Sequence, residues 1–194
     1  EFTNFGAELN HRFANGWQAR LAANNFNVST FENSLYVRGP IDPDDGIGVG
    51  EPYFNNDGES GYNLDASLTG EYDAFGRVHQ FVVGASYLSS NMSFDESYGV
   101  DETPFNIYDP DYSIPVAGGE FVNFFNQSRD YRQVGVYGQT NFRVTDRLRL
   151  IGGGRLSWAD FDSVDRNNPA RILAGYDENA VLTPMLGAVY DLTD

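Results

Sequence analysis

Alternation of apolar and polar residues with a period of two is the feature that most constrains the fold of this chain. It is longest in residues 131–158, which predict two strands joined by a tight turn. One face of this hairpin carries Val134, Val136, Thr140, Phe142, Val144, Leu148, Leu150, Leu156 and Trp158. The other carries Gln133, Tyr137, Gln139, Asn141, Arg143, Arg149, Arg155 and Ser157. A soluble sandwich buries such an apolar face against a second sheet, whereas a membrane barrel turns it to lipid and its polar face to a wet lumen.

The same alternation appears in residues 62–72. Their apolar face carries Tyr62, Leu64, Ala66, Leu68, Gly70 and Tyr72. Their polar face carries Asn63, Asp65, Ser67, Thr69 and Glu71. Aromatic rings stand at both ends of the apolar face, as expected where a barrel wall meets the two membrane interfaces.

The chain repeats a plan of strand, tight turn, strand and long loop, which gives about seven strands. Compact soluble domains rarely carry several structureless loops longer than about 12–15 residues, but outer-membrane barrels combine short periplasmic turns with long extracellular loops. We therefore predict an all-β, antiparallel transmembrane β-barrel segment with its short turns in the periplasm. The predicted tight turns are 14–16, 73–76, 145–147 and 193–194. The predicted long loops are 39–61, 95–130 and 163–179.

The size of the complete barrel follows from strand length. The predicted strand 17–38 far exceeds the about 10 residues that a barrel strand needs to cross a bilayer. Such strands are typical of large plugged transporters with about 22 strands. The chain starts at Glu1 without an initiator Met or a leader, and single-chain bacterial barrels have even strand numbers, so we expect 1–194 to be an internal piece of a longer protein.

Composition excludes several other classes of function. The net charge of −16 has the wrong sign for a nucleic-acid partner. The absence of Cys excludes disulfides and thiolate metal sites. The only two histidines, His11 and His79, lie in predicted strands without the partners of a catalytic triad or a zinc site, so no enzyme is predicted. The acidic run 41–46 lacks the spacing of an EF-hand and predicts a solvated turn.

Two segments carry a family resemblance. Residues 134–158, VGVYGQTNFRVTDRLRLIGGGRLSW, resemble a barrel hairpin of the TonB-dependent ferric-siderophore receptors. The branch they resemble most comprises receptors for ferric pyoverdine and for ferric coprogen or rhodotorulic acid. Residues 182–194, LTPMLGAVYDLTD, resemble the strand and turn that follow in those proteins. Weaker similarity extends over all the predicted hairpins.

The resemblance implies a receptor in the outer membrane of a Gram-negative bacterium that imports ferric siderophores with energy from TonB. Residues 1–194 would be part of its barrel domain, and the plug domain, the TonB-contacting segment and the C-terminal strands would lie outside them. The implied partners are a ferric siderophore, the TonB–ExbB–ExbD complex, which the missing N-terminal region would contact, and outer-membrane lipid and lipopolysaccharide. No resident cofactor is implied, because iron is present only in the cargo.

Aromatic residues gather in the predicted loops and are the candidate ligand contacts. Ferric siderophores are mixed polar and aromatic ligands, often anionic, which rings can stack on and an arginine can pair with. The alternative is that these rings pack the loops on themselves. The candidate residues are Tyr53, Phe54, Tyr98, Tyr108, Tyr112, Phe124, Phe125 and Arg129.

Four charged residues of the polar faces, Arg143, Arg149, Arg155 and Glu71, are expected to form a charge ladder between strands, with plug contacts as the alternative.

Three other functions stay open. A receptor of the same architecture could take cobalamin, haem or a glycan, and a passive porin would lack a plug. A soluble β-rich carbohydrate-binding module would need a second sheet over the apolar faces.

Overall fold

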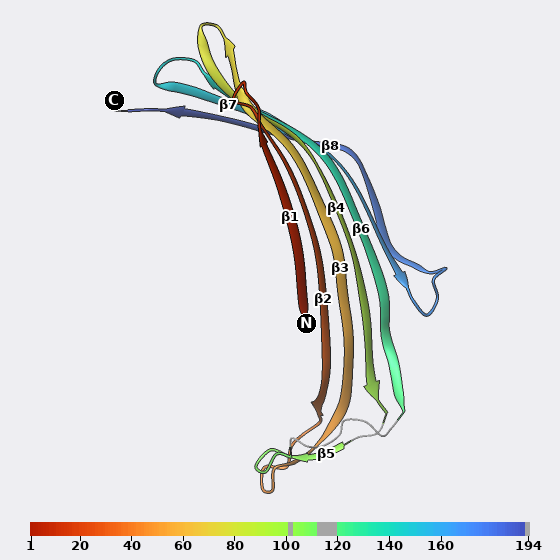
Figure 1. The fold of residues 1–194 in the computed structure, drawn as a ribbon. Coiled ribbons are helices and arrows are strands. Elements are labelled where there is room, and N and C mark those ends of the chain that lie inside the picture. Colours follow the sequence, from red (N-terminus) through yellow and green to blue (C-terminus); the bar gives the residue numbers. More distant parts are fainter. Residues whose placement is uncertain (101–102, 112–119, 193–194) are drawn as a thin grey trace.

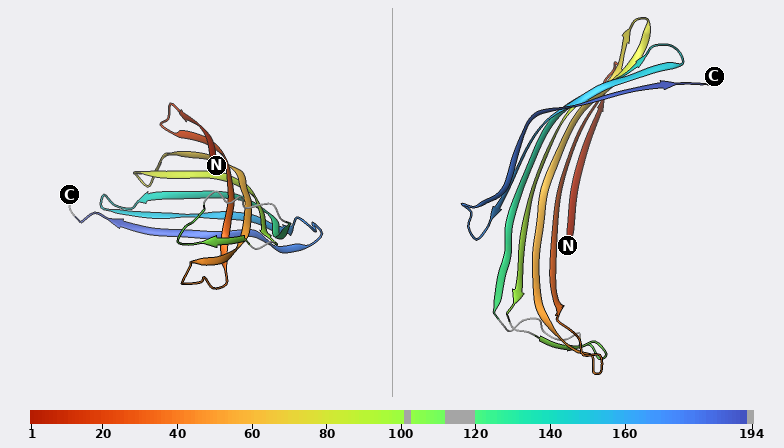
Figure 2. Two further views of the ribbon diagram at one scale, coloured as in Figure 1. Left: turned by 90° about the horizontal axis from the view of Figure 1, so that it is seen from below. Right: turned by 180° about the vertical axis from the view of Figure 1, so that it is seen from behind.

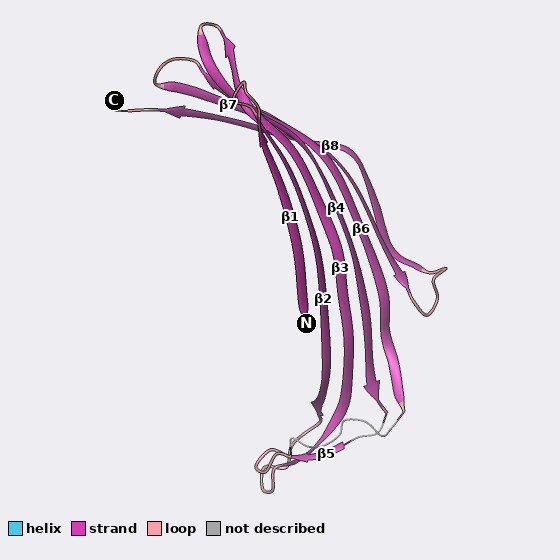
Figure 3. Cartoon of the chain, in the orientation of Figure 1, coloured by secondary structure: helices cyan, strands magenta, loops and turns pink. Residues whose placement is uncertain are grey.

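The computed structural model describes residues 1–100, 103–111 and 120–192, which form a single curved antiparallel sheet (Figure 1). Its strand order is β1-β2-β3-β4-β6-β7-β8, and the short β5 pairs with the start of β3. Figure 3 shows that regular structure in the described residues is strand throughout. The strands are β1 (Phe2–Arg12), β2 (Gln18–Arg38), β3 (Ile47–Ala74), β4 (Arg77–Gly99), β5 (Thr103–Asn106), β6 (Phe121–Arg143), β7 (Leu148–Asp165) and β8 (Ile172–Tyr190).

The described residues form one layer, and the two further views show the long strands bending together as one wall (Figure 2). Within that part of the chain Ala159 is the one buried hydrophobic residue, while Leu21, Val136 and Leu186 on the apolar face are 53%, 45% and 89% exposed. No described helix is long and apolar enough to cross a membrane. A soluble sandwich would cover these side chains with a second sheet, so that alternative is wrong for the described residues.

Strand register confirms the two faces predicted for 131–158. Val134 lies opposite Trp158 and Val136 opposite Leu156, which places these four side chains on one face. Tyr137 lies opposite Arg155 on the other face. Directly paired residues share a face because side chains alternate along both strands. We call the apolar side of the whole sheet the outer face and the polar side the inner face.

The outer face changes from apolar to polar within one step of the pleat. One cross-strand row consists of Leu64, Tyr87, Val134 and Trp158. The next row toward the loops consists of Tyr62, Ser89, Arg132 and Asp160. A boundary this sharp is typical of a barrel wall where it leaves the hydrocarbon core.

Aromatic side chains mark the opposite boundary near the short turns. Tyr72, His79 and Phe142 lie side by side there, and the rings of His79 and Phe142 stack at 4.1 Å. Tyr62 and Tyr72 are ten residues apart in β3, which is about 33 Å along a strand. At the tilt of 35–45° usual for such strands, this spans roughly 25 Å, the height of a barrel's apolar band.

Strands extend into all three of the predicted long loops, so these loops are shorter than the sequence predicts. β3 already begins at Ile47, β4 continues to Gly99 and β6 starts at Phe121. β7 and β8 are separated by residues 166–171 alone. Beyond the membrane both faces of a strand meet water, so these strand ends lose the apolar alternation from which strands were recognised. β5, inside the predicted loop 95–130, gave no signal for the same reason.

The tight turns lie where the sequence predicted them, apart from 193–194, which lies outside the described residues. Between β3 and β4, Phe75 and Gly76 both have positive φ angles, 52° and 72°, as a two-residue hairpin of this kind requires. Between β6 and β7, the hydroxyl of Thr145 accepts hydrogen bonds from the backbone N–H groups of Arg147 and Leu148. Local side-chain acceptors of this type stabilise turns.

The inner face is held by both hydrogen bonds and ion pairs. Arg155 donates to the hydroxyls of Ser86 and Ser157, both at 2.9 Å. Arg149 pairs with Asp191 at 3.2 Å. The four residues of the expected ladder do not pair with one another, because Arg143 and Arg149 face each other with like charge and Glu71 accepts a hydrogen bond from Gln80. The ladder is confirmed only to the extent that Arg149 pairs with Asp191, just after the neighbouring strand.

Candidate functional site

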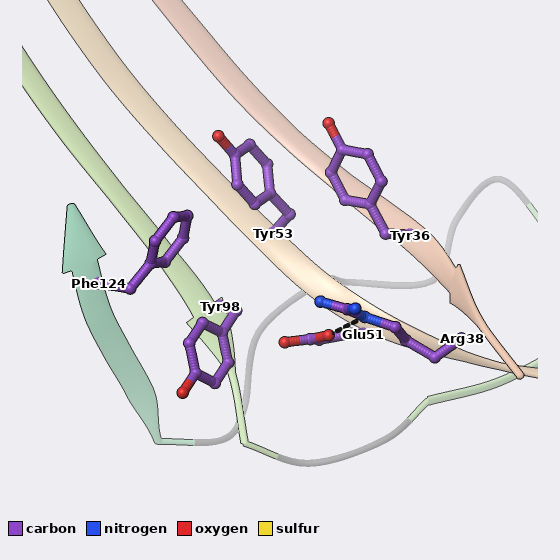
Figure 4. A pocket seen from close by; sticks show the side chains of 6 residues that line it. All are labelled: Tyr36, Arg38, Glu51, Tyr53, Tyr98 and Phe124. Carbon is purple, nitrogen blue, oxygen red and sulfur yellow. Dashed lines mark ion pairs between the residues drawn. The ribbon is translucent and has the colours of Figure 1, made fainter.

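The candidate site is a cavity of about 360 Å³ at the loop end of the sheet (Figure 4). Strands β2, β3, β4 and β6 meet there, well beyond the apolar-to-polar boundary at Tyr62. Six side chains line it: Tyr36, Arg38, Glu51, Tyr53, Tyr98 and Phe124.

Strand register places this cavity on the inner face. Tyr36 pairs with Glu51, and Tyr53 pairs with Tyr98. Tyr53 is an even number of residues from Asp65 in the same strand, so both side chains project to the polar side. The site therefore opens toward the space that the curved wall encloses, at its loop end.

Four aromatic rings form a continuous surface. Tyr36 and Tyr53 meet edge to face with their centroids 4.9 Å apart. Tyr53 and Phe124 are 6.2 Å apart, and Tyr98 and Phe124 are 5.7 Å apart. These separations are within the range of favourable ring contacts. Phe124 remains 51% exposed, so the surface is open to a ligand.

An irregularity in β6 explains why Phe124 reaches this surface. Phe125 pairs with Glu96, but the next residue of β4, Ser97, pairs with Asn123, so Phe124 is an extra residue in the ladder. Regular alternation would put Phe124 and Phe125 on opposite faces. The β-bulge instead lets both rings contact the inner face, Phe124 at Tyr98 and Phe125 at Phe94.

Polar groups of the site are largely paired with each other. Arg38 forms an ion pair with Glu51, drawn as a dashed line in Figure 4. The Tyr53 hydroxyl donates to Glu96 at 2.6 Å. Burial raises the pKa of Tyr53, and the bond to Glu96 raises that pKa further, because a phenolate would lose this donor and repel the carboxylate. Tyr53 thus stays a hydrogen-bond donor at any physiological pH.

Three of the eight predicted ligand residues, Tyr53, Tyr98 and Phe124, come together in the cavity. Four others, Phe54, Tyr108, Phe125 and Arg129, do not line it. Phe54 points to the outer face, where its ring meets Phe31 at 5.2 Å. Tyr112 lies outside the described residues.

Three predicted residues have other neighbours. Tyr108 donates its hydroxyl to the carbonyl oxygen of Pro43, which is the loop-packing alternative. The Arg129 guanidinium lies 4.5 Å from the centroid of the Phe94 ring, and Phe125 contacts the same ring.

Sequence reasoning missed Tyr36, Arg38 and Glu51. A usable signal was present in β2, because Tyr36 and Arg38 share a face at the end of a strand too long for the membrane alone. Glu51 was hidden in the predicted loop 39–61, which β3 in fact enters. Acidic residues of that loop cap its turn: Asp42 and Asp45 accept hydrogen bonds from the backbone N–H groups of Asp44 and Ile47.

The chemistry of the cavity is that of binding. Its rings offer stacking area, and its hydroxyls and carboxylates offer directional hydrogen bonds. Across the residues that the structure describes, no three His, Asp or Glu side chains are grouped to hold a metal ion.

Comparison with known proteins gives a consistent result. The sequence model of the family described as "TonB dependent receptor-like, beta-barrel" matches residues 1–194. The chain is 28% identical to the ferric-pyoverdine M114 receptor PbuA of Pseudomonas sp. strain M114, over 97% of this chain and 24% of that protein. It is 30% identical to the ferric-pyoverdine 358 receptor of Pseudomonas putida, over 99% of this chain and 24% of that protein. The chain thus spans about a quarter of the length of the curated relatives that it matches.

The fold is also that of a solved receptor. The structure of the pyoverdine outer membrane receptor FpvA from Pseudomonas aeruginosa PAO1 bound to pyoverdine superposes with a TM-score of 0.76. The match is 24% identical and covers 97% of this chain and 26% of that chain. The whole sheet, including its curvature and strand order, therefore corresponds to part of a known barrel wall.

Proposed function

Because the chain belongs to the β-barrel family of TonB-dependent receptors, we propose that its parent, the longer protein that contains it, imports a ferric siderophore across the outer membrane of a Gram-negative bacterium. The relatives named as ferric-pyoverdine receptors support a siderophore as the cargo. The observation that carries the proposal within this chain is the aromatic cavity on the inner face, at the loop end.

The chain would supply two parts of such a transporter. Its outer face would form lipid-facing wall, and its cavity would contribute to capture of the ligand before passage. The edges of β1 and β8 have no partner strand among the described residues, which fits a wall continued by other strands of the parent. A plug domain and a TonB-contacting segment would be supplied by other parts of the parent.

No chemical change of the ligand is part of this proposal. Iron would enter as cargo, bound by the siderophore, and the energy would come through TonB and its partners ExbB and ExbD. The barrel's contribution is then selective binding, and it is neither an enzyme nor a holder of a resident cofactor. A passive porin is disfavoured because the matched relatives are named as receptors for particular ferric chelates.

Uptake of radioactive iron tests the proposal. A strain that lacks its other iron receptors but carries the parent would receive a panel of iron-labelled ferric pyoverdines and ferric hydroxamates, with iron-labelled haem and cobalt-labelled cobalamin as rival ligands. We expect TonB-dependent uptake from at least one ferric siderophore. Uptake of haem or cobalamin alone would refute a siderophore as the cargo.

Point variants then test the cavity. Tyr98→Ala and Phe124→Ala should each weaken binding of the transported chelate to the purified parent about tenfold, because an aromatic contact contributes about 0.5–1.5 kcal/mol beyond its buried area. Phe54→Ala and Tyr108→Ala are matched controls that remove rings from the same end of the wall but not from the cavity. Equal loss in all four variants would refute the assignment of the site.

A further inference from the structure

The cavity carries more negative than positive charge, and this bears on which part of a ligand it accepts. Glu51 lines it, and Glu96 and Glu32 accept hydrogen bonds from the hydroxyls of its tyrosines, Tyr53 and Tyr36. Against these three carboxylates stands one cation, Arg38.

Arg38 is already neutralised. Its guanidinium forms an ion pair with Glu51, and Figure 4 shows the two side chains facing each other at one end of the cavity. Arg129, which the sequence offered as a partner for an anionic ligand, lies over the Phe94 ring instead. The one arginine of the lining is therefore paired with a carboxylate, and Arg129 lies outside the lining.

A row of hydrogen-bond acceptors lies next to the rings, two residues nearer the short turns along each strand. Glu32, Asn55 and Glu96 are direct neighbours across β2, β3 and β4. The row above them contains Tyr53 and Tyr98. The carboxamide oxygen of Asn55 is buried and has no hydrogen-bond partner among the described residues. A buried acceptor without a donor is costly, and the row as a whole offers acceptors and no charged donor.

Aromatic faces and carboxylates both attract cations. The faces of Tyr and Phe rings carry the negative part of the ring quadrupole, which attracts ammonium and guanidinium groups. Carboxylates strengthen this attraction and repel an anionic group at the same position. The combination of four rings and an acceptor row is typical of sites for organic cations.

We propose that this cavity binds a cationic group, a primary ammonium or a guanidinium, carried by the ligand. The identity of the natural ligand rests on the proposed function, but the preference of the cavity for a cation does not. The volume of about 360 Å³ is near the lower end of the range for small-molecule sites, so it suits a side arm rather than a whole chelate. The iron centre of the ligand would then lie outside this cavity.

Three small aromatic probes of different charge test the proposal. Benzylamine, benzyl alcohol and phenylacetate share a benzyl group and carry a positive, no and a negative charge. Their affinities for the full-length parent in lipid nanodiscs would be measured by saturation-transfer NMR. We expect benzylamine to bind at least tenfold more tightly than the other two probes.

Variants test which side chains cause the preference for benzylamine. The double variant Glu32→Gln/Glu96→Gln keeps the shapes of both side chains and should reduce the preference for benzylamine to threefold or less. Phe124→Ala should weaken the binding of all three probes, because each presents the same ring. Glu71→Gln, which removes an inner-face carboxylate near the short turns, is the matched control and should change nothing.

Several outcomes would overturn the proposal. These are equal or tighter binding of benzyl alcohol or phenylacetate, binding of none of the probes, and a preference that survives in the double variant. Each leaves the result of the iron-uptake experiment untouched, so failure of this inference is distinguishable from failure of the proposed function.

Discussion

The hydroxyl of Tyr137 in β6 donates a hydrogen bond to the carboxylate of Asp65 in β3, at 2.9 Å, although β4 lies between the two strands. The tyrosine reaches across because the residue beneath its ring is Gly84, which has no side chain. Asp65 also accepts from Arg20 at 3.0 Å, and Arg20 pairs with Glu8 at 2.7 Å. Side chains thus tie the inner face together from β1 to β6.

Gly84→Val should break the hydrogen bond between Tyr137 and Asp65. A Cβ atom at position 84 would lie 2.7 Å from the backbone carbonyl oxygen of Ala66 and would collide with the Tyr137 ring, so the ring must leave Asp65. Overpacking of this kind costs about 1–3 kcal/mol. The free energy of unfolding of the parent, refolded in lipid vesicles, measures the loss.

Gly138→Ala is the control for that experiment. A Cβ atom at position 138 meets nothing nearer than 3.5 Å, which is an ordinary contact. We expect little change in stability from Gly138→Ala. If both glycine variants were equally unstable, the space above Gly84 would not be the cause.

A charge introduced on the outer face should destabilise the protein by an amount that depends on its depth in the bilayer. Val136 lies in the same cross-strand row as Ala85 and Ala66, midway between the two aromatic boundaries. Val136→Arg should therefore destabilise the parent by about 2–4 kcal/mol, as expected at a bilayer midplane. Ser89→Arg, in the first polar row, should cost about 0–1 kcal/mol. Equal costs at the two positions would contradict the location of the boundary.

His79 should matter more to stability than its place on the outer face suggests. It is 1% exposed, its Nε2–H donates to the carbonyl oxygen of Ala74 at 2.8 Å, and its Nδ1 accepts from the backbone N–H of Arg143 at 3.0 Å. His79→Ala leaves both backbone groups without this partner, at a cost of about 1–3 kcal/mol for each that stays buried.

Two further variants separate the contributions of His79. His79→Phe retains a ring against Phe142 but loses both hydrogen bonds, so its loss relative to the wild type isolates them. His11→Ala removes the other histidine, which is exposed on β1, and should change stability by less than about 0.5 kcal/mol. A His79→Ala loss as small as that of His11→Ala would contradict the structural role.

The spanning part of the wall was predictable because a membrane imposes a pattern on it. Between Tyr62 and Tyr72 one face of each strand meets lipid, and strict alternation and tight turns fixed the strands and their pairing. Outside that band no such pattern is imposed. The sequence therefore predicts loops where the structure extends β3 back to Ile47 and β6 back to Phe121.

The candidate site was only half predictable for a related reason. Composition pointed to Tyr53, Tyr98 and Phe124, but no local pattern shows that Tyr36 lies beside Tyr53; this follows from the pairing of β2 with β3. The β-bulge at Phe124 shifts the register by one residue and has no sequence signature of its own. Arg129 was assigned to the ligand because its actual partner, Phe94, is in a different strand.

The chain's two tryptophans give a direct test of membrane placement. Trp17 lies at the short-turn end, where its ring meets Phe81 at 5.2 Å and its Nε1–H donates to the carbonyl oxygen of Glu71. Trp158 lies in the outer-face row opposite Val134, next to the apolar-to-polar boundary. Both should sit at membrane interfaces, where aromatic belts lie.

Single-tryptophan versions of the parent, with Trp17 or Trp158 as the one fluorophore, would be refolded in vesicles that contain brominated lipids. Bromine atoms near the ester groups should quench each tryptophan more strongly than bromine atoms near the ends of the acyl chains, because each ring lies close to an interface. Equally weak quenching by both lipids would mean that the outer face is not in contact with the bilayer. Stronger quenching of Trp158 from the chain ends would place the upper boundary beyond the row that contains Tyr62, Arg132 and Asp160.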